Sequence, residues 1–223
     1  MVYLMVEQQF AKYPWCQRAI RGIFEEVRKR RIHVQEVSEL PGGAEERSCV
    51  LLVGASEEWI NQTARGAGSL GLHPIVLSNR ETNSSGLSVS SVKMDIHSSM
   101  ELAVDYLRTL GRERLALFGV NPSASSDLWR ARRFGELTGR EGDVFFLGSS
   151  VNEIFDQFYE KIHRYDGVIC ASDYAAVSLV GRLREKNYAI PEKLYVVGYG
   201  DMFLSRLFRP SITSISDDYE SFG

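Results

Sequence analysis

The chain has 223 residues and a net charge of −3, with 44% hydrophobic and 25% charged residues. A globular chain of this size buries roughly 70 to 75% of its unfolded surface, so neither a disulfide nor a metal is needed to hold it together. The small negative charge offers no general attraction for a polyanion, which argues against direct nucleic acid binding by this segment.

The three cysteines, Cys16, Cys49 and Cys170, are an odd number without CxxC spacing. We therefore expect buried, reduced thiols rather than a disulfide or a metal site. No apolar run approaches the roughly 20 residues of a membrane span, and the apolar start at 1–6 is too short for a signal peptide. These features predict a cytoplasmic protein.

Strands and helices alternate through the first half of the chain, a pattern typical of a parallel sheet. The predicted strands are 2–6, 33–37, 49–54, 73–78 and 91–95, and the predicted helices are about 15–31 and 57–68. The stretch 81–91 is rich in serine, asparagine and glycine and predicts no element. We place the first crossover to a second lobe at the short strand that follows it.

The second half repeats the alternation. It predicts helices at 98–110, 127–138 and 152–164 and strands at 114–119 and 143–148, followed by a strand, helix and strand within 166–201. The chain then passes Pro210 and returns toward the first lobe. The predicted domains are an N-terminal lobe of 1–95 with the return segment 215–223, and a C-terminal lobe of 96–214. Two such lobes joined by adjacent crossovers would form a hinge around a cleft.

The run 166–201, DGVICASDYAAVSLVGRLREKNYAIPEKLYVVGYGD, places polar residues at the carboxyl ends of two strands. Ser172 and Asp173 follow the first strand, where a helix would begin. Ligands of open parallel sheets lie outside the carboxyl ends of the strands, beside helix amino termini. This layout predicts a binding crevice and by itself indicates no reaction.

That run resembles the effector-binding core of the LacI/GalR family of bacterial transcription regulators, which shares its fold with periplasmic sugar-binding proteins. Other segments also resemble the family and stand in the family's order, so that together with this run they cover nearly the whole chain: 13–30, 73–81, 100–119 and 210–216. The resemblance implies an α/β protein with two Rossmann-like parallel-sheet lobes joined by a hinge, the type I periplasmic binding protein-like fold. It also implies a homodimer.

Relatives continue beyond the position of Gly223 with a helix and further strands, and they carry a helix-turn-helix at the amino end. We therefore expect this chain to be a fragment with its C-terminal part truncated and without the helix-turn-helix. DNA would then be bound only through a domain outside this chain.

The segment Tyr13, Pro14, Trp15 and Cys16 lies between the first strand and its helix. An aromatic pair at such a position can stack on a sugar ring or a base, and the matching aromatic positions in the family line the effector cleft. The resemblance thus makes Tyr13, Trp15 and Cys16 candidate effector-binding residues. The structural alternative is that Trp15 packs the start of the helix onto the sheet.

Asn79 and Arg80 stand where relatives usually carry an Asp-Arg pair. An amide donates and accepts hydrogen bonds whereas a carboxylate only accepts, so the recognised hydroxyl pattern should differ from that of relatives. The alternative role of Asn79 is to cap a turn. Arg130, four residues before Phe134, resembles the family's effector-contacting arginine, whose planar fork suits paired hydroxyls or a carboxylate.

Ser172 and Asp173 match the family's Asn-Asp step, and Asp173 could instead cap the helix. Many relatives have two consecutive acids where this chain has Gly200 and Asp201, so Asp201 is a candidate contact or a turn carboxylate. On the returning segment, Asp217 and Tyr219 resemble positions at the cleft floor.

The sequence contains no GxSxG, P-loop, HExxH or early GxGxxG motif, and its four histidines are scattered. We expect no enzyme activity, no cofactor and no metal. The favoured interpretation is an effector-sensing regulator core that binds a small polar ligand, most simply a sugar. The alternatives are a sugar-binding or other solute-binding protein of a transporter and, less favoured, a sugar-modifying hydrolase.

Overall fold

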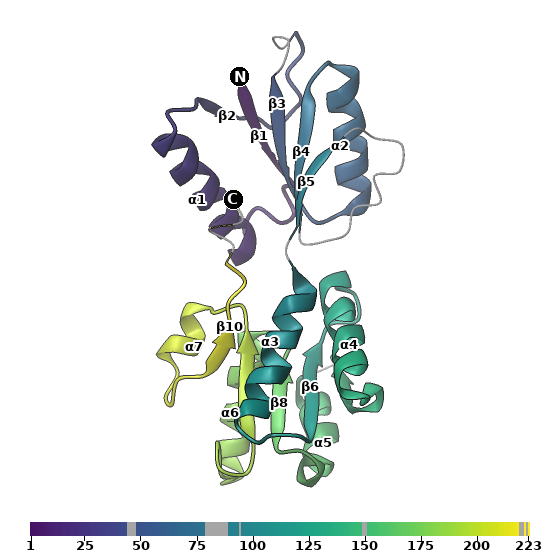
Figure 1. Cartoon of the computed structure of the whole chain (residues 1–223), viewed down its shortest axis with the longest axis vertical. Coiled ribbons are helices and arrows are strands. Elements are labelled where there is room, and N and C mark those ends of the chain that lie inside the picture. Colours follow the sequence, from purple (N-terminus) through teal and green to yellow (C-terminus); the bar gives the residue numbers. More distant parts are fainter. Residues whose placement is uncertain (44–47, 79–88, 94, 149–150, 219–220, 222) are drawn as a thin grey trace. The chain divides into compact units, whose positions relative to one another are not determined.

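The computed structural model describes residues 1–43, 48–78, 89–93, 95–148, 151–218, 221 and 223. The chain forms two compact units (Figure 1). Unit 1 comprises Met1–Met94 and Asp218–Gly223, and unit 2 comprises Asp95–Asp217. No helix in the described ranges is long and apolar enough to cross a membrane.

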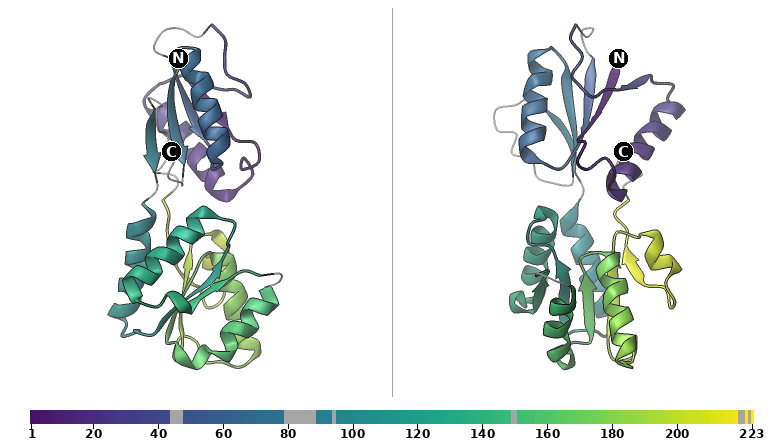
Figure 2. Two further views of the ribbon diagram at one scale, coloured as in Figure 1. Left: turned by 90° about the vertical axis from the view of Figure 1, so that its right-hand side faces the viewer. Right: turned by 180° about the vertical axis from the view of Figure 1, so that it is seen from behind.

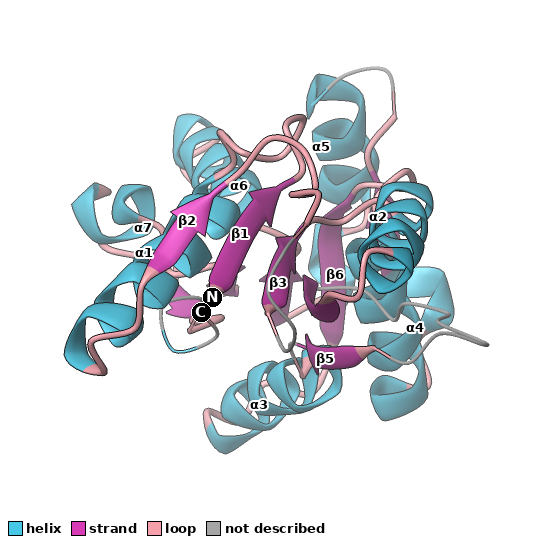
Figure 3. Cartoon of the chain, turned by 90° about the horizontal axis from the view of Figure 1, so that it is seen from above, coloured by secondary structure: helices cyan, strands magenta, loops and turns pink. Residues whose placement is uncertain are grey.

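Unit 1 is a parallel sheet of five strands in the order β2-β1-β3-β4-β5. Figure 3 shows β2, β1 and β3 side by side. The strands are β1 (Val2–Val6), β2 (Val34–Glu36), β3 (Cys49–Val53), β4 (His73–Ser78) and β5 (Ser90–Lys93), and the helices are α1 (Pro14–Lys29) and α2 (Glu57–Ser69).

The alternation of side chains along β1 assigns one helix to each face of this sheet. Leu4 packs in one cluster with Ile23 of α1, whereas the preceding residue, Tyr3, packs in another cluster with Ile60 of α2. Successive strand residues point to opposite faces, so each helix buries its own set of apolar side chains. Unit 1 therefore has two cores, one on each side of a buried sheet.

Unit 2 is a second parallel sheet of five strands, in the order β10-β9-β8-β6-β7. Its strands are β6 (Leu115–Val120), β7 (Val144–Phe146), β8 (Gly167–Cys170), β9 (Tyr195–Tyr199) and β10 (Thr213–Ile215). Its helices are α3 (Ile96–Thr109), α4 (Ser125–Thr138), α5 (Val151–Glu160), α6 (Asp173–Glu185) and α7 (Phe203–Leu207).

Helices cover both faces of this second sheet as well. Residues of α3 and α4 pack on one face of the strands, and residues of α5 and α6 pack on the other. The left view of Figure 2 separates the teal helix α3 from the green helix α6. Every residue of β6 is buried, as expected for an inner strand of a parallel sheet.

Ile215 corrects one predicted boundary. It was predicted to lie in the first lobe, but it pairs with Tyr199 as the last residue of β10 and packs in the core of unit 2. The return to unit 1 therefore begins only after Asp217.

An aromatic group fills the core between α5 and the sheet of unit 2. The ring of Phe158 lies 5.3 Å from that of Phe118 and 5.2 Å from that of Phe145, both edge to face, and it stacks on Tyr165 at 5.7 Å. Aromatic pairs at these separations add to the hydrophobic stabilisation of the same buried area. Phe158 has no exposed surface, so it is the centre of this group.

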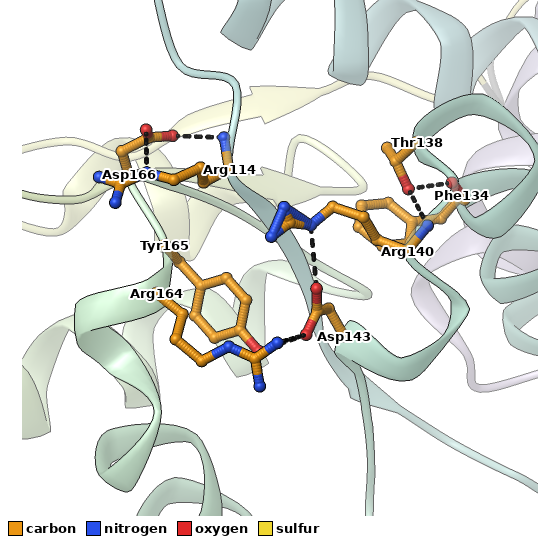
Figure 4. A network of polar contacts seen from close by, with 8 residues as sticks. All are labelled: Arg114, Phe134, Thr138, Arg140, Asp143, Arg164, Tyr165 and Asp166. Carbon is orange, nitrogen blue, oxygen red and sulfur yellow. Dashed lines mark hydrogen bonds and ion pairs between the residues drawn. The ribbon is translucent and has the colours of Figure 1, made fainter.

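Charged residues brace the amino-terminal edge of the same sheet, where β6, β7 and β8 begin (Figure 4). Asp143 accepts a hydrogen bond from the Tyr165 hydroxyl at 2.7 Å and binds Arg140 at 2.9 Å and Arg164 at 3.5 Å. Burial and the bond to Asp143 raise the pKa of Tyr165 to about 12. Asp166 likewise binds Arg114 at 3.0 Å, so these two acids are paired with arginines, which is the arrangement of a structural brace.

Glu7, the residue after β1, joins the carboxyl ends of β1 and β3 to the start of α2. Its Oε2 accepts from the backbone N–H groups of Ala55 at 2.8 Å and Ser56 at 2.9 Å, while Oε1 accepts from the side chains of Ser56 and Gln9. A Cβ at Gly54 would lie 2.7 Å from Oε2, so only glycine leaves room for this carboxylate. Burial opposes the charge, but hydrogen bonds from Ser56, Gln9 and Ala55 lower the pKa of Glu7 overall.

We predict that Phe158→Ala lowers the free energy of unfolding by about 3 to 5 kcal/mol, because it leaves a cavity among aromatic rings. Urea unfolding followed by circular dichroism measures this. Phe146→Ala is the control, since Phe146 lies on β7 and is 45% exposed. Equal losses for the two variants would contradict the central role of Phe158.

We predict that Glu7→Gln costs about 1 to 3 kcal/mol of unfolding free energy at pH 7, because hydrogen bonds to a charged acceptor are lost. The pKa of Glu7 is lowered on folding, so its contribution is present above the unfolded pKa and is lost as the pH falls through the folded value. Wild type and variant should therefore converge in stability in acid.

Urea titrations at several pH values measure this difference, with the exposed Glu36→Gln on β2 as control. A Glu7→Gln deficit that stays constant from pH 7 to pH 3 would show that the charge of Glu7 is not involved.

Candidate ligand-binding site

The strand order places a topological switch point in each unit. In unit 1 the chain passes from β1 to β2 on one side and to β3 on the other, and in unit 2 it passes from β6 to β7 and then to β8 on the opposite side. Crevices of open parallel sheets form at the carboxyl ends of the strands that flank such a point. The residues after β1, β3, β6 and β8 therefore flank these crevices.

A buried ion cluster lies at the carboxyl edge of unit 2. Arg130 Nη1 donates to Asp127 Oδ1 at 2.8 Å, and Arg130 Nη2 donates to Asp217 Oδ2 at 3.3 Å. The guanidinium carbon of Arg130 lies 3.9 Å from the ring centroid of Tyr199, a cation–π contact. We call Asp127, Arg130, Tyr199 and Asp217 the Arg130 cluster.

Three different parts of unit 2 supply this cluster. Asp127 and Arg130 are one turn apart on α4, Tyr199 ends β9, and Asp217 follows β10. Asp127 Oδ2 also accepts from the backbone N–H of Asn121 at 2.9 Å, directly after β6. Asp127 thus fixes α4 to the end of the strand at the switch point.

The charged side chains of this cluster are buried, so water screens their interactions weakly. Arg130 is 7% and Asp217 is 8% exposed. Burial alone lowers the pKa of Arg130, but Tyr199, Asp217 and Asp127 outweigh that effect, so its pKa is raised above the ordinary arginine value. The guanidinium is therefore a permanent cation held between two acids.

A second polar group, the Asp173 cluster, lies where β8 and β9 end. Ser172 Oγ accepts from the backbone N–H of Ala175 at 3.2 Å and so caps α6. Asp173 has no exposed surface; it accepts from the Met202 backbone N–H at 2.6 Å and from Ser214 Oγ at 2.6 Å. Its carboxylate holds three strand ends together.

Glycine at position 198 makes room for that carboxylate, since a Cβ there would lie 2.2 Å from Asp173 Oδ1. Asp201, which completes the Asp173 cluster, has a positive φ of 45°. Its backbone N–H donates to Ser214 Oγ at 2.9 Å, and its carboxylate binds both Nε, at 2.9 Å, and Nη2 of Arg206. Asp201 is thus paired with an exposed arginine of α7.

The candidate residues of unit 1 have different surroundings. Tyr13 is 52% exposed, and Trp15 is half-buried. The ring of Phe10 lies 5.5 Å from that of Tyr13 and 6.1 Å from that of Trp15. Cys16 is fully buried in the core between α1 and the sheet, where burial raises the pKa of its thiol to about 11.

Three candidate residues, Asn79, Arg80 and Tyr219, lie outside the described residues. Of the others, the structure brings Arg130 and Asp217 into contact and gathers Ser172, Asp173 and Asp201 at the ends of β8 and β9. Among the described residues, no group of three or more His, Cys, Asp or Glu side chains is placed to hold a metal ion.

Sequence reasoning missed Glu7, Asp127, Tyr199 and Ser214. Two local signals were available: Glu7 is a charged residue directly after an apolar strand, and Asp127 stands three residues before Arg130, the spacing of a helical ion pair. For Ser214 no local signal exists, because its partner Asp173 is 41 residues away.

Comparison with known proteins agrees with this architecture. A family model described as a periplasmic binding protein-like domain matches residues 104–223. The HTH-type transcriptional regulator RegA of Clostridium saccharobutylicum is 33% identical over 86 residues, 39% of this chain and 22% of RegA. The matches to the first curated relatives span about a fifth of those proteins' own length.

Two solved structures share the fold over all of this chain. A LacI transcriptional regulator from a Rhodococcus species has a TM-score of 0.73 at 22% identity, with 86% of its chain covered. The LacI family regulator CCPA from Weissella paramesenteroides with bound sucrose has a TM-score of 0.68 at 16% identity, with 88% covered. Since the family model matches more than half of its residues, the chain belongs to the periplasmic binding protein-like domain family, and its relatives by sequence and by fold are LacI-type transcriptional regulators.

Proposed function

We propose that this chain is the effector-sensing core of a LacI/GalR-type transcriptional regulator, and that its effector is a small polar molecule, a sugar. The Arg130 cluster carries this proposal. It sets a buried, fixed fork of hydrogen-bond donors beside carboxylate acceptors at the switch point of unit 2. Sugars present paired hydroxyls that need donors and acceptors in such fixed positions.

The relatives support the same ligand class. One structural neighbour is a LacI family regulator with bound sucrose, and one sequence relative is an arabinose metabolism transcriptional repressor from Halalkalibacterium halodurans. In unit 1, the exposed ring of Tyr13 and the half-buried ring of Trp15 suit stacking on the apolar face of a sugar.

In the proposed mechanism, the ligand binds at the Arg130 cluster, on the carboxyl edge of unit 2. Binding then favours one hinge state over another, because the ligand has more contacts in that state. A homodimer would transmit the change to two DNA-binding domains attached outside this chain, whose spacing decides whether both half-sites are engaged. No covalent chemistry is involved.

We predict that this chain binds at least one neutral sugar in isothermal titration calorimetry, and that Arg130→Lys weakens this binding by roughly tenfold or more. Lysine keeps the charge but cannot reproduce the planar, two-sided donor geometry of arginine. Arg132→Lys is the matched control, because Arg132 lies on the same helix but is exposed and pairs with Glu136 at 3.1 Å.

The neutral sugars to be titrated are arabinose, glucose, fructose, sucrose and cellobiose. Wild-type affinity in Arg130→Lys would reject this site, and no binding by the folded wild type to any sugar would reject the sensing role. Operator-binding assays on the full-length gene product, with and without the bound sugar, test the regulatory half of the proposal.

A further inference from the structure

The Arg130 cluster has an unusual charge balance for a binding site built around an arginine. Both outer nitrogens of Arg130 already bind carboxylates, one from Asp127 and one from Asp217. The side chains of Asp127, Arg130 and Asp217 are 14%, 9% and 9% exposed, so water screens them poorly. With both acids ionised, one cation faces two anions, and the cluster is negative overall.

From this balance we infer that the site selects uncharged, hydroxyl-rich ligands and excludes phosphorylated or carboxylated ones, with Asp127 as a specificity-determining residue. The inference rests on the proposed function, because it concerns the ligand class of the same site. It extends that function from sugars in general to neutral sugars, and it names a residue that the resemblance does not assign.

The exclusion follows from what an anion would have to displace. A phosphate or carboxylate beside Arg130 adds a third anion to a single cation, and a full ion pair with Arg130 would leave the buried carboxylate of Asp127 or Asp217 without its cation. A hydroxyl needs no such exchange, because it donates to a carboxylate oxygen and accepts from a guanidinium N–H at the same time. A neutral polyol therefore adds hydrogen bonds to the cluster while an anion breaks them.

The neighbouring Asp173 cluster reinforces this preference. Asp173 is fully buried and accepts from two neutral donors, the Met202 N–H and the Ser214 hydroxyl, and Asp201 pairs with Arg206. Together the two clusters at this edge hold four carboxylates and two guanidinium groups. The combined charge of the two clusters therefore repels anions.

Asp127 is the residue at which this selectivity can be changed with least disturbance. Besides binding Arg130, it accepts from the backbone N–H of Asn121. An asparagine has the same size and keeps one oxygen acceptor, so Asp127→Asn removes the charge while one of the two contacts can persist. Without the charge of Asp127, the positive charge of Arg130 is balanced by the negative charge of Asp217, and the cluster has no net charge.

The test measures the affinities of neutral sugars and of their phosphate esters by calorimetry, for example glucose with glucose 6-phosphate and fructose with fructose 6-phosphate. We expect wild type to prefer the neutral partner by at least about tenfold, and Asp127→Asn to reduce this ratio by at least about fivefold, mainly through tighter ester binding. Because the charges are buried, moderate salt should change the ratio little.

Asp105→Asn is the matched control, because it removes the same unit of charge from an exposed position. Asp105 lies on α3, and its side chain is 72% exposed. Its ratio should stay within about twofold of wild type, since an exposed charge is screened. If Asp127→Asn fails to fold, Asp217→Asn replaces it with the same expected direction.

The selectivity inference is overturned if wild type binds the esters as tightly as the neutral sugars or more tightly. It is also overturned if the ratio of sugar affinity to ester affinity is unchanged in both Asp127→Asn and Asp217→Asn. In either case, sugar binding by wild type still supports the proposed function. If folded wild type binds neither sugars nor esters, the proposed function fails and this inference fails with it.

Discussion

Within the described residues, each strand pairs with its neighbours in parallel, and this constraint decides where polar groups can lie. Parallel neighbours need crossover connections, and the helices of those connections cover both faces of each sheet. The faces are then committed to apolar packing. Only the two edges, where strands begin and end, remain for charged side chains and for ligands.

The two edges of unit 2 use that freedom differently. At the amino-terminal edge, Asp143 binds Arg140 and Arg164, and Asp166 binds Arg114, so acids and bases compensate each other. At the carboxyl edge, the Arg130 and Asp173 clusters together hold more carboxylates than guanidinium groups, and Asp173 accepts from two neutral donors, the Met202 N–H and the Ser214 hydroxyl. The amino-terminal edge therefore stabilises the fold, whereas the carboxyl edge places several carboxylate acceptors beside the fixed guanidinium of Arg130.

Much of the architecture was predictable because it depends on local periodicity. The alternation of apolar segments predicted the two-lobed parallel fold, which the structure and the comparisons confirm. Boundaries were less accurate where tertiary contacts decide them. The predicted strand 143–148 is only Val144–Phe146, and the predicted helix 152–164 is α5 to Glu160 followed by a 3₁₀ turn at Ile162–Arg164.

The candidate site was predictable only in part, for the same physical reason. The helix start after β8 is a local signal, but the predicted alternative role of Asp173 as its cap is wrong, because Ser172 is the cap and its Oγ accepts from the Ala175 N–H. The partners of Glu7 and Arg130 are not local: Glu7 meets Ser56, 49 residues away, and Arg130 meets Asp217, 87 residues away. Such pairs arise from strand order, which single-sequence periodicity does not specify.

Each unit contains a buried free cysteine whose reactivity can report local unfolding of that unit. Cys16 is sealed within the core of unit 1, and Cys170 is sealed within the core of unit 2, where burial raises its pKa. A buried protonated thiol is a poor nucleophile, so alkylating reagents reach each sulfur only when its surrounding helices detach. The alkylation rates of Cys16 and Cys170 would therefore measure the local unfolding of unit 1 and of unit 2 separately, without an introduced label.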